Sequence, residues 1–291
     1  MMMRIVAFAR LLLNTALLNA ALWSAAAAAE SDFYANQELQ RQMPGAFALQ
    51  PQARGFLKPA FAMTIRQADA LVAAIEKDQA LRDAIARWPE LSIDEQIPHL
   101  KRIFALETAV MEIAPPKLVI DNHSYPGRTV YFDFDPQKPS TGTVYLNPDK
   151  LAARNKYDAL AFLIHETRHS YQFQLAYADE AGDKPEQVSP IAEGYRSAFE
   201  AQKTLKGFSF SDFLTLLNEY EAFQFANYVV GKLTDWQLEM TDMGTFASQF
   251  DREGRLKIDL IRLSETPSDA SVLERYNRLA KAQYEQRARR Q

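Results

Sequence analysis

The chain has 291 residues, with 47% hydrophobic side chains, 33 basic and 37 acidic residues, and no cysteine. The absence of cysteine excludes disulfides, thiolate metal ligands and cysteine nucleophiles. The formal charge of −4 gives no sign of a nucleic-acid-binding surface. A chain of this length can bury a sizeable core, so we expect a globular protein with no nucleic-acid partner.

The first 29 residues have the pattern of a secretory signal peptide. A basic residue, Arg4, precedes an apolar stretch over 5–23, and small residues over 24–29 lead to the polar Glu30. A retained membrane anchor is the alternative, because the apolar stretch is nearly long enough to span a bilayer. We expect residues 1–29 to be cleaved, the mature protein to be periplasmic or secreted, and membrane contact to be limited to export.

Residues 30–60 and 61–115 differ in their sequence pattern. Proline and glycine punctuate residues 30–60, which predicts an irregular lead-in. Residues 61–115 are expected to be helical. Apolar side chains recur at helical spacing from Thr64, a suitable N-cap, to Trp88, and a second helix is predicted from Ser92 or Ile93 to Glu112.

Residues 116–291 combine a small sheet with further helices. Three short β-branched or aromatic segments predict a sheet of about three strands: Lys117–Asn122, Arg128–Phe134 and Thr143–Asn147. After Pro148 the pattern is helical over Tyr157–Tyr177, Ile191–Leu205, Ser211–Leu233, more loosely over Thr234–Phe250, and again over Ser271–Arg289. The expected fold class is therefore α+β and predominantly helical.

The motif H-E-x-x-H closes an apolar run in the first of these helices. Residues four apart lie on one helical face, so His165 and His169 can direct two imidazoles at a single ion. Glu166 can reach a water on that ion, which is where a general base must lie. The alternative is an amphipathic helix that carries two histidines by chance.

A catalytic zinc site usually has three protein ligands, so a third must come from elsewhere. His99 and His123 lie upstream in surroundings that do not mark them as ligands. Glu219 shares a helical face with small and apolar residues, where a carboxylate needs a partner such as a divalent cation. Glu221 lies about 200° further round the same helix, so only one of the two can face the ion. We favour Glu219 as the third ligand, and Glu193 and Glu221 remain alternatives. If they are not ligands, Glu221 is expected to be a solvated or salt-bridged helix residue and Glu193 an acidic first-turn residue that complements the helix dipole.

These residues carry a resemblance to a known family. H-E-x-x-H at 165–169, followed by Glu219-Tyr220-Glu221-Ala222, resembles the zincin metallopeptidases of the gluzincin kind, whose third ligand is a Glu in an E-x-x-A setting. The run 165–172 is similar to an H-E-x-R-H-x-x-Q motif of mostly uncharacterised bacterial secreted proteins interpreted as metallopeptidases. The resemblance covers about 117–233. The chain departs from it at Phe223, where the family has Asp, and it lacks the third histidine of the metzincins.

The resemblance implies a zincin-like core, with the sheet packed on the H-E-x-x-H helix and further helices around it. It implies an exported zinc-dependent metallopeptidase in which His165, His169 and Glu219 hold Zn²⁺ and Glu166 is the general base. The substrate would be a peptide or a protein. The alternative is a non-catalytic zinc-binding or scaffold protein on the same fold, because a fold does not fix a function.

Zincins also bind extended substrate along an edge strand beside the active helix. Val144, Tyr145 and Leu146, just upstream of the motif, stand where that strand is expected. Backbone pairing there would give affinity with little sequence preference. The alternative is that this segment is an ordinary strand of the sheet.

Overall fold

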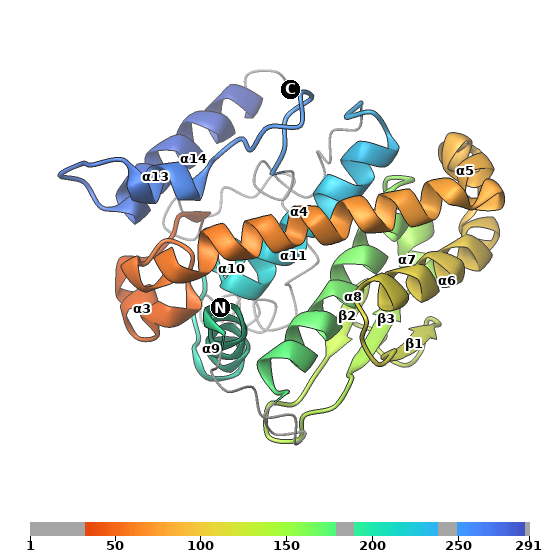
Figure 1. Cartoon of the computed structure of the whole chain (residues 1–291), viewed down its shortest axis with the longest axis horizontal. Coiled ribbons are helices and arrows are strands. Elements are labelled where there is room, and N and C mark those ends of the chain that lie inside the picture. Colours follow the sequence, from red (N-terminus) through yellow and green to blue (C-terminus); the bar gives the residue numbers. More distant parts are fainter. Residues whose placement is uncertain (1–32, 179–188, 238–248, 289–291) are drawn as a thin grey trace, which may run out of the picture.

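The structure is a computed structural model that describes residues 33–178, 189–237 and 249–288. It is α+β and mostly helical, with one three-stranded mixed sheet, which confirms the predicted fold class at this level (Figure 1). The predicted signal peptide, residues 1–29, lies outside the described residues. Within them, no helix is long and apolar enough to cross a membrane.

The helices and strands follow one another in a simple order. The first part of the chain contains α3 (Gln37–Arg41), the 3-10 turns η2 (Pro44–Ala46) and η3 (Pro51–Ala53), α4 (Arg54–Lys77), α5 (Gln79–Ala86), η4 (Trp88–Glu90) and α6 (Ile93–Val110). The sheet is built from β1 (Lys117–Ile120), β2 (Val130–Asp133) and β3 (Thr143–Leu146). The remaining helices are α7 (Pro148–Ala152), α8 (Asp158–Ala176), α9 (Pro190–Thr204), α10 (Phe210–Leu214), α11 (Leu217–Leu233), α13 (Leu260–Glu265) and α14 (Val272–Ala288).

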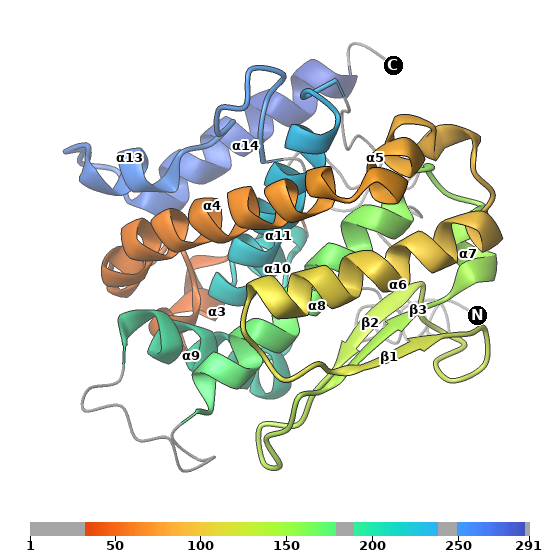
Figure 2. The same ribbon diagram turned by 45° about the vertical axis from the view of Figure 1, so that its right-hand side comes forward.

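Helix α8, which carries the H-E-x-x-H motif, lies at the centre of the molecule. It packs against β2 and β3 on one side and against α6, α9 and α11 on the others, while α4 lies across α11 (Figures 1 and 2). Nearly all of its side chains are buried, including the continuous run from Ala159 to Ile164. A helix that is apolar almost all round can only be stable inside a core, so its polar residues have to find partners there too.

The sheet has the strand order β1-β3-β2, which corrects one prediction. Strand β3 pairs in parallel with β1 and antiparallel with β2, so both of its sides are occupied. Val144, Tyr145 and Leu146 are therefore residues of the central strand, and all three are fully buried. The expectation that they form a substrate-binding edge was wrong, because the parallel pairing of β1 with β3 is a non-local contact that local sequence cannot reveal. Strand β2 is the end strand nearest to α8.

The lead-in is more ordered than predicted. Helix α4 begins at Arg54, so Thr64 lies in its interior, where its hydroxyl oxygen is 2.8 Å from the Ala60 carbonyl oxygen. Pro59 lies in the second turn of α4, where it removes one backbone hydrogen bond. The burial of Phe56 and Ala60 in the core offsets this loss, so the helix continues through the proline. The single helix predicted from Thr64 to Trp88 is divided at Asp78, whose side chain caps α5.

A second predicted helix, Ser211–Leu233, is also divided, and the division places a site residue. The Ala48 N–H donates to the Thr215 carbonyl oxygen at 2.7 Å, and Phe47 forms a β-bridge with Leu216. This pairing with the lead-in separates α10 from α11. As a result Glu219 lies in the first turn of α11, where the helix dipole favours a negative charge.

The other predicted elements agree with the structure to within a few residues. Helix α6 begins at the expected Ser92 cap, which forms a capping box with Glu95. Most of the predicted piece Thr234–Phe250 lies outside the described residues. A single hydrophobic cluster extends from Ala35 to Ala280, so the lead-in, the helical segment 61–115 and the region after it share one core.

Candidate metal centre

Two neighbouring helices bring the predicted ligands together. His165 and His169 lie one turn apart on α8, and Glu219 reaches them from the first turn of α11. All three side chains are buried, with exposed fractions of 1%, 4% and 4%. The packing of α8 on α11 therefore places a carboxylate directly over the histidine pair.

The distances in this cluster suit a divalent metal ion. The two histidine Nε2 atoms are 3.0 Å apart, and the Glu219 Oε2 atom lies 3.3 Å from His165 Nε2 and 3.4 Å from His169 Nε2. Ligand atoms at about 2.0–2.1 Å from a tetrahedral zinc ion are about 3.3–3.4 Å from one another. Among the described residues, this is the one group of three histidine, aspartate or glutamate side chains with ligand atoms this close. The donor set and its spacing thus fit zinc.

The carboxylate of the cluster is ionised and the two histidines differ in their pKa values. Burial acts to raise the pKa of Glu219, but the charges and hydrogen bonds of His169 and His165 outweigh it and lower the pKa to about 2. Burial acts to lower the pKa of His169, and the Glu219 carboxylate outweighs it and raises the pKa to about 9. Burial lowers the pKa of His165, and the neighbouring His169 lowers it further. Glu219 is therefore an ionised carboxylate in an apolar interior.

Glu166 lies beside the cluster with a different character. Burial raises its pKa to about 8, while the charge of His169 lowers it and that of Glu219 raises it. Its Oε1 atom has no hydrogen-bond partner among the described residues. A carboxyl group with a pKa near neutrality and a free oxygen is suited to exchange protons at the site.

Two glutamines form hydrogen bonds with the cluster, Gln172 with His169 and Gln202 with Glu219. Gln172 Oε1 lies 2.8 Å from His169 Nδ1. Gln202, on α9, donates from Nε2 to Glu219 Oε1 at 2.7 Å and accepts from Asn218 Nδ2 at 2.9 Å. Gln172 ends the H-E-x-R-H-x-x-Q run found in the sequence, whereas the sequence analysis missed Gln202. No local signal marks Gln202, because its contact depends on how α9 packs against α11.

The alternative third ligands have other environments. Glu221 is paired with Arg168, which donates to both carboxylate oxygens at 2.7 to 3.1 Å. Arg168 thus points away from the histidine cluster and forms a structural ion pair with Glu221. Glu193 is an exposed residue in the first turn of α9. Neither carboxylate is part of the histidine cluster.

Among the described residues no further strand pairs with the outer edge of β2, which runs beside the motif helix. Because the Asn147 N–H donates to the Thr129 carbonyl oxygen at 2.8 Å, alternation along an antiparallel pair directs the backbone groups of Val130 and Phe132 away from β3. The Phe132 backbone lies close enough to Glu166 to affect its pKa by hydrogen bonding. The outward groups of β2 therefore face the side of the sheet where Glu166 lies.

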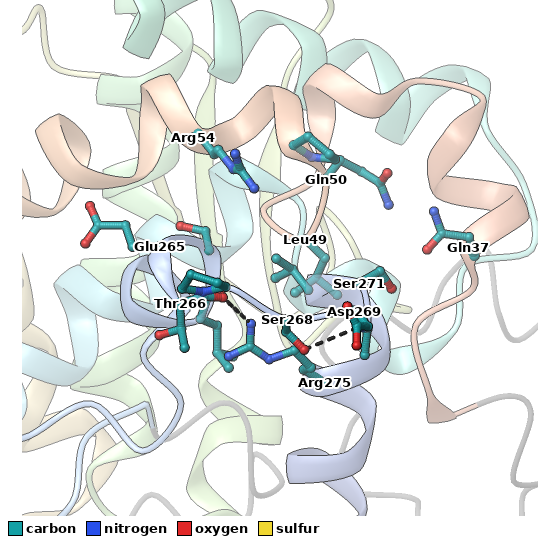
Figure 3. A pocket seen from close by; sticks show the side chains of 16 residues that line it. Gln37, Leu49, Gln50, Arg54, Glu265, Thr266, Ser268, Asp269, Ser271 and Arg275 are labelled. Atoms are coloured by element: carbon teal, nitrogen blue, oxygen red, sulfur yellow. Dashed lines mark hydrogen bonds between the residues drawn. The ribbon is translucent and has the colours of Figure 1, made fainter.

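A separate pocket of about 550 Å³ lies between the start of α4 and the α13–α14 connection (Figure 3). Its lining includes Gln50, Arg54, Glu265 and Arg275 and none of the histidine cluster. The Arg275 guanidinium donates to the Leu263 and Thr266 carbonyl oxygens, so it fastens the connection between the two helices. We assign no chemistry to this pocket.

The sequence matches no protein-family model, and comparisons with curated proteins and with solved structures find no significant match. The interpretation of the site therefore depends on its own geometry.

Proposed function

We propose that this protein is a zinc-dependent metallopeptidase with a zincin-like core. The observation that carries the proposal is the buried cluster of His165, His169 and Glu219, whose three ligand atoms have the spacing of a tetrahedral zinc site, with Glu166 directly beside it. The motif helix packed on a small sheet supports the same interpretation. The protein would belong to the hydrolases, with Zn²⁺ as its cofactor.

The chemistry follows from the positions of these side chains. Zinc held by the three ligands would polarise the scissile carbonyl and lower the pKa of a coordinated water to about 7. Glu166 is the general base: it takes a proton from the attacking water and passes it to the leaving amine. In the protein without metal, burial raises the pKa of Glu166 to about 8. A bound cation beside it would lower that pKa again, toward the range of a base that is ionised at neutral pH.

Peptide substrate would bind in an extended conformation along β2. The outward backbone groups of Val130 and Phe132 can pair with a substrate strand, and this mode of binding needs few side-chain contacts. In this proposal β2 replaces the central strand β3 as the substrate-binding edge. Val130 and Phe132 are only 1% and 3% exposed, backbone included, so the edge of β2 would have to be uncovered before a substrate strand could pair with it.

The test combines metal content with turnover. Purified protein would be loaded with zinc, and the wild type compared with Glu219→Ala, Glu193→Ala and Glu166→Gln by elemental analysis and by cleavage of an unfolded protein substrate. We expect about one zinc per chain in the wild type, in Glu193→Ala and in Glu166→Gln, with loss of zinc in Glu219→Ala. Only the wild type and Glu193→Ala would cleave, and a chelator would stop them.

Two outcomes would redirect the proposal. A wild-type protein that holds one zinc without any turnover would support the alternative, a non-catalytic zinc-binding or scaffold protein. A wild-type protein that binds no zinc would contradict both the metallopeptidase and the zinc-binding alternative. We further propose that residues 1–29 are a cleaved signal peptide and that the enzyme works in the periplasm or outside the cell; N-terminal sequencing of the exported protein would show a start near Glu30.

A further inference from the structure

The amide of Gln172 has its orientation fixed by the groups that surround it. Its Nε2 atom donates to the Asn218 carbonyl oxygen at 2.8 Å and to Glu221 Oε2 at 2.6 Å. A carbonyl and a carboxylate can only accept, so the NH₂ end of the amide must point toward them. The oxygen end, Oε1, then has to face His169 Nδ1, at 2.8 Å.

This arrangement decides where His169 carries its proton. An amide oxygen can only accept, so Nδ1 must be the donor in this contact whether the ring holds one proton or two. The opposite nitrogen, Nε2, then points at the Glu219 carboxylate and at His165. A ring with its proton at Nδ1 and its lone pair at Nε2 is the tautomer that a metal at the cluster requires.

The orientation of Gln172 is in turn held by a buried ion pair. Glu221 receives three hydrogen bonds from Arg168 and one from the Thr64 hydroxyl on α4. Arg168 is fully buried, donates to Gln67 Oε1 at 2.7 Å, and is stacked between the rings of Tyr171 and Phe225 at 4.2 and 4.4 Å. Because Arg168 has no freedom to rotate, Glu221 presents Oε2 to Gln172 in one geometry.

We propose that Gln172 is a positioning residue that holds His169 with its proton at Nδ1 and Nε2 toward the metal, and that the buried Arg168–Glu221 pair fixes Gln172 in this orientation. The proposal rests on the proposed metal centre and goes beyond it, because it assigns a role to an uncharged side chain that touches neither metal nor substrate. His165 differs: its Nδ1 atom has no partner among the described residues, so this ring is held by packing, including Phe223 at 4.2 Å between ring centroids.

The experiment measures zinc affinity by competition with a chelator, in the wild type, Gln172→Met and Gln172→Glu. Methionine keeps the length of the side chain and removes all three of its hydrogen bonds, so the dissociation constant for zinc should rise about 10- to 100-fold. Glutamate keeps an acceptor for Nδ1, and with a proton on its other oxygen it can still donate to Glu221, so at mildly acidic pH it should recover most of the affinity. Gln174→Met is the matched control, because Gln174 lies on the same helix and bonds to Ala114 and Ser170 instead, so its affinity should stay that of the wild type.

A second readout reports the proton itself. In NMR spectra of the zinc-loaded protein, the His169 Nδ1 proton should exchange slowly with solvent in the wild type and in Gln172→Glu, and rapidly in Gln172→Met. Equal loss of affinity in Gln172→Met and Gln172→Glu would show that Gln172 acts through packing alone, and would overturn the proposal. So would a wild-type Nδ1 proton that exchanges as fast as that of the exposed His123, a result that needs no variant to fold.

The outcomes separate this inference from the proposed function. If the wild type binds zinc and Gln172→Met binds it equally well, the positioning role is wrong and the metallopeptidase proposal is unaffected. If the wild type binds no zinc, the metal centre is wrong and this inference falls with it. If zinc binding and the slow proton are both present without turnover, the positioning role stands and the enzymatic proposal fails.

Discussion

Two glutamates on α11, only two positions apart, have opposite environments. Glu221 is buried and is neutralised by the protein's own cation, Arg168, which contacts both of its oxygens. Glu219 is equally buried, but its neighbours are two histidines and the Gln202 amide. The Glu221 carboxylate is already paired with a permanent cation of the protein. The Glu219 carboxylate has no such permanent partner, so it can bind an added cation such as a metal ion. This contrast favours Glu219 over Glu221 as a metal ligand.

The largest expected effect on stability comes from removing the arginine of the buried Arg168–Glu221 ion pair. Arg168→Met would leave the Glu221 charge buried without its cation, which should lower the free energy of unfolding by about 3–5 kcal/mol. The double variant Arg168→Met with Glu221→Met should recover most of that loss, because an apolar replacement of a whole pair is often neutral. Urea unfolding of the metal-free proteins measures both.

The exposed pair of Arg255 with Glu253 supplies the control for this experiment. Arg255→Met should change stability little, because water already screens that pair. A similarly small change in Arg168→Met would contradict the description of Arg168 and Glu221 as a buried ion pair.

The dependence of stability on pH separates the two glutamates. In the metal-free protein the pKa of Glu219 is lowered to about 2, so its contribution is present above its usual pKa of 4.5 and is lost as the pH falls toward 2. The pKa of His169 is raised from 6.5 to about 9, so the same pairing is complete below 6.5 and is lost as the pH rises through 9. Arginine keeps its charge over this range, so the Glu221 pair has no alkaline loss.

We therefore expect metal-free wild-type protein to lose about 3 kcal/mol of unfolding free energy between pH 6 and pH 10 from this pairing. Unfolding titrations in the presence of a chelator would measure the loss. Glu219→Gln should have a flatter alkaline limb than the wild type. If the two limbs are parallel, His169 and Glu219 do not form the pair described.

Zinc should stabilise the folded protein through one cluster only. At a free zinc concentration one hundred times the dissociation constant, binding should raise the free energy of unfolding of the wild type by about 2.7 kcal/mol. Glu219→Gln should lose most of this gain, which thermal denaturation with and without zinc would detect. An undiminished gain in Glu219→Gln would mean that the metal binds elsewhere.

The smallest expected effect concerns Gln202, which holds the Glu219 oxygen that does not face the histidines. Gln202→Met should weaken zinc binding about 10-fold or more, because the carboxylate would be free to rotate. The affinity can be compared with that of Gln79→Met, since Gln79 bonds to Asp83 on α5, away from the cluster. Equal affinities in the two variants would show that packing alone orients Glu219.

The cluster of His165, His169 and Glu219 could be predicted from the sequence because each of these residues has a local signature. The spacing of His165 and His169 is set by helical periodicity, and Glu219 stood out as a carboxylate among apolar neighbours. Predicted strands and most helices also agreed with the structure, since they depend on local pattern. The order of those strands in the sheet could not be derived in the same way.

The misses share a different cause. The order β1-β3-β2, the interruption of α10–α11 by Phe47 and Ala48, and the contact of Gln202 with Glu219 all join residues distant in sequence. The early start of α4 was missed because Pro59 was given the weight of a helix breaker, while burial of Phe56 and Ala60 outweighs it. Local sequence patterns were thus enough to find His165, His169 and Glu219, whereas the contact of Gln202 with Glu219 depends on tertiary packing.

The reach of Thr64 across the molecule has a consequence for how the centre is assembled. Its hydroxyl contacts a carboxylate 157 positions later, and Gln67 contacts a guanidinium 101 positions later. Contacts of such sequence separation slow folding, because a long loop must close before they can form. During synthesis Arg168 would have no counterion until the ribosome had released α11, which carries Glu221. A fragment that began at the H-E-x-x-H helix would lose α4 and so could not rebuild the support of its own ligands.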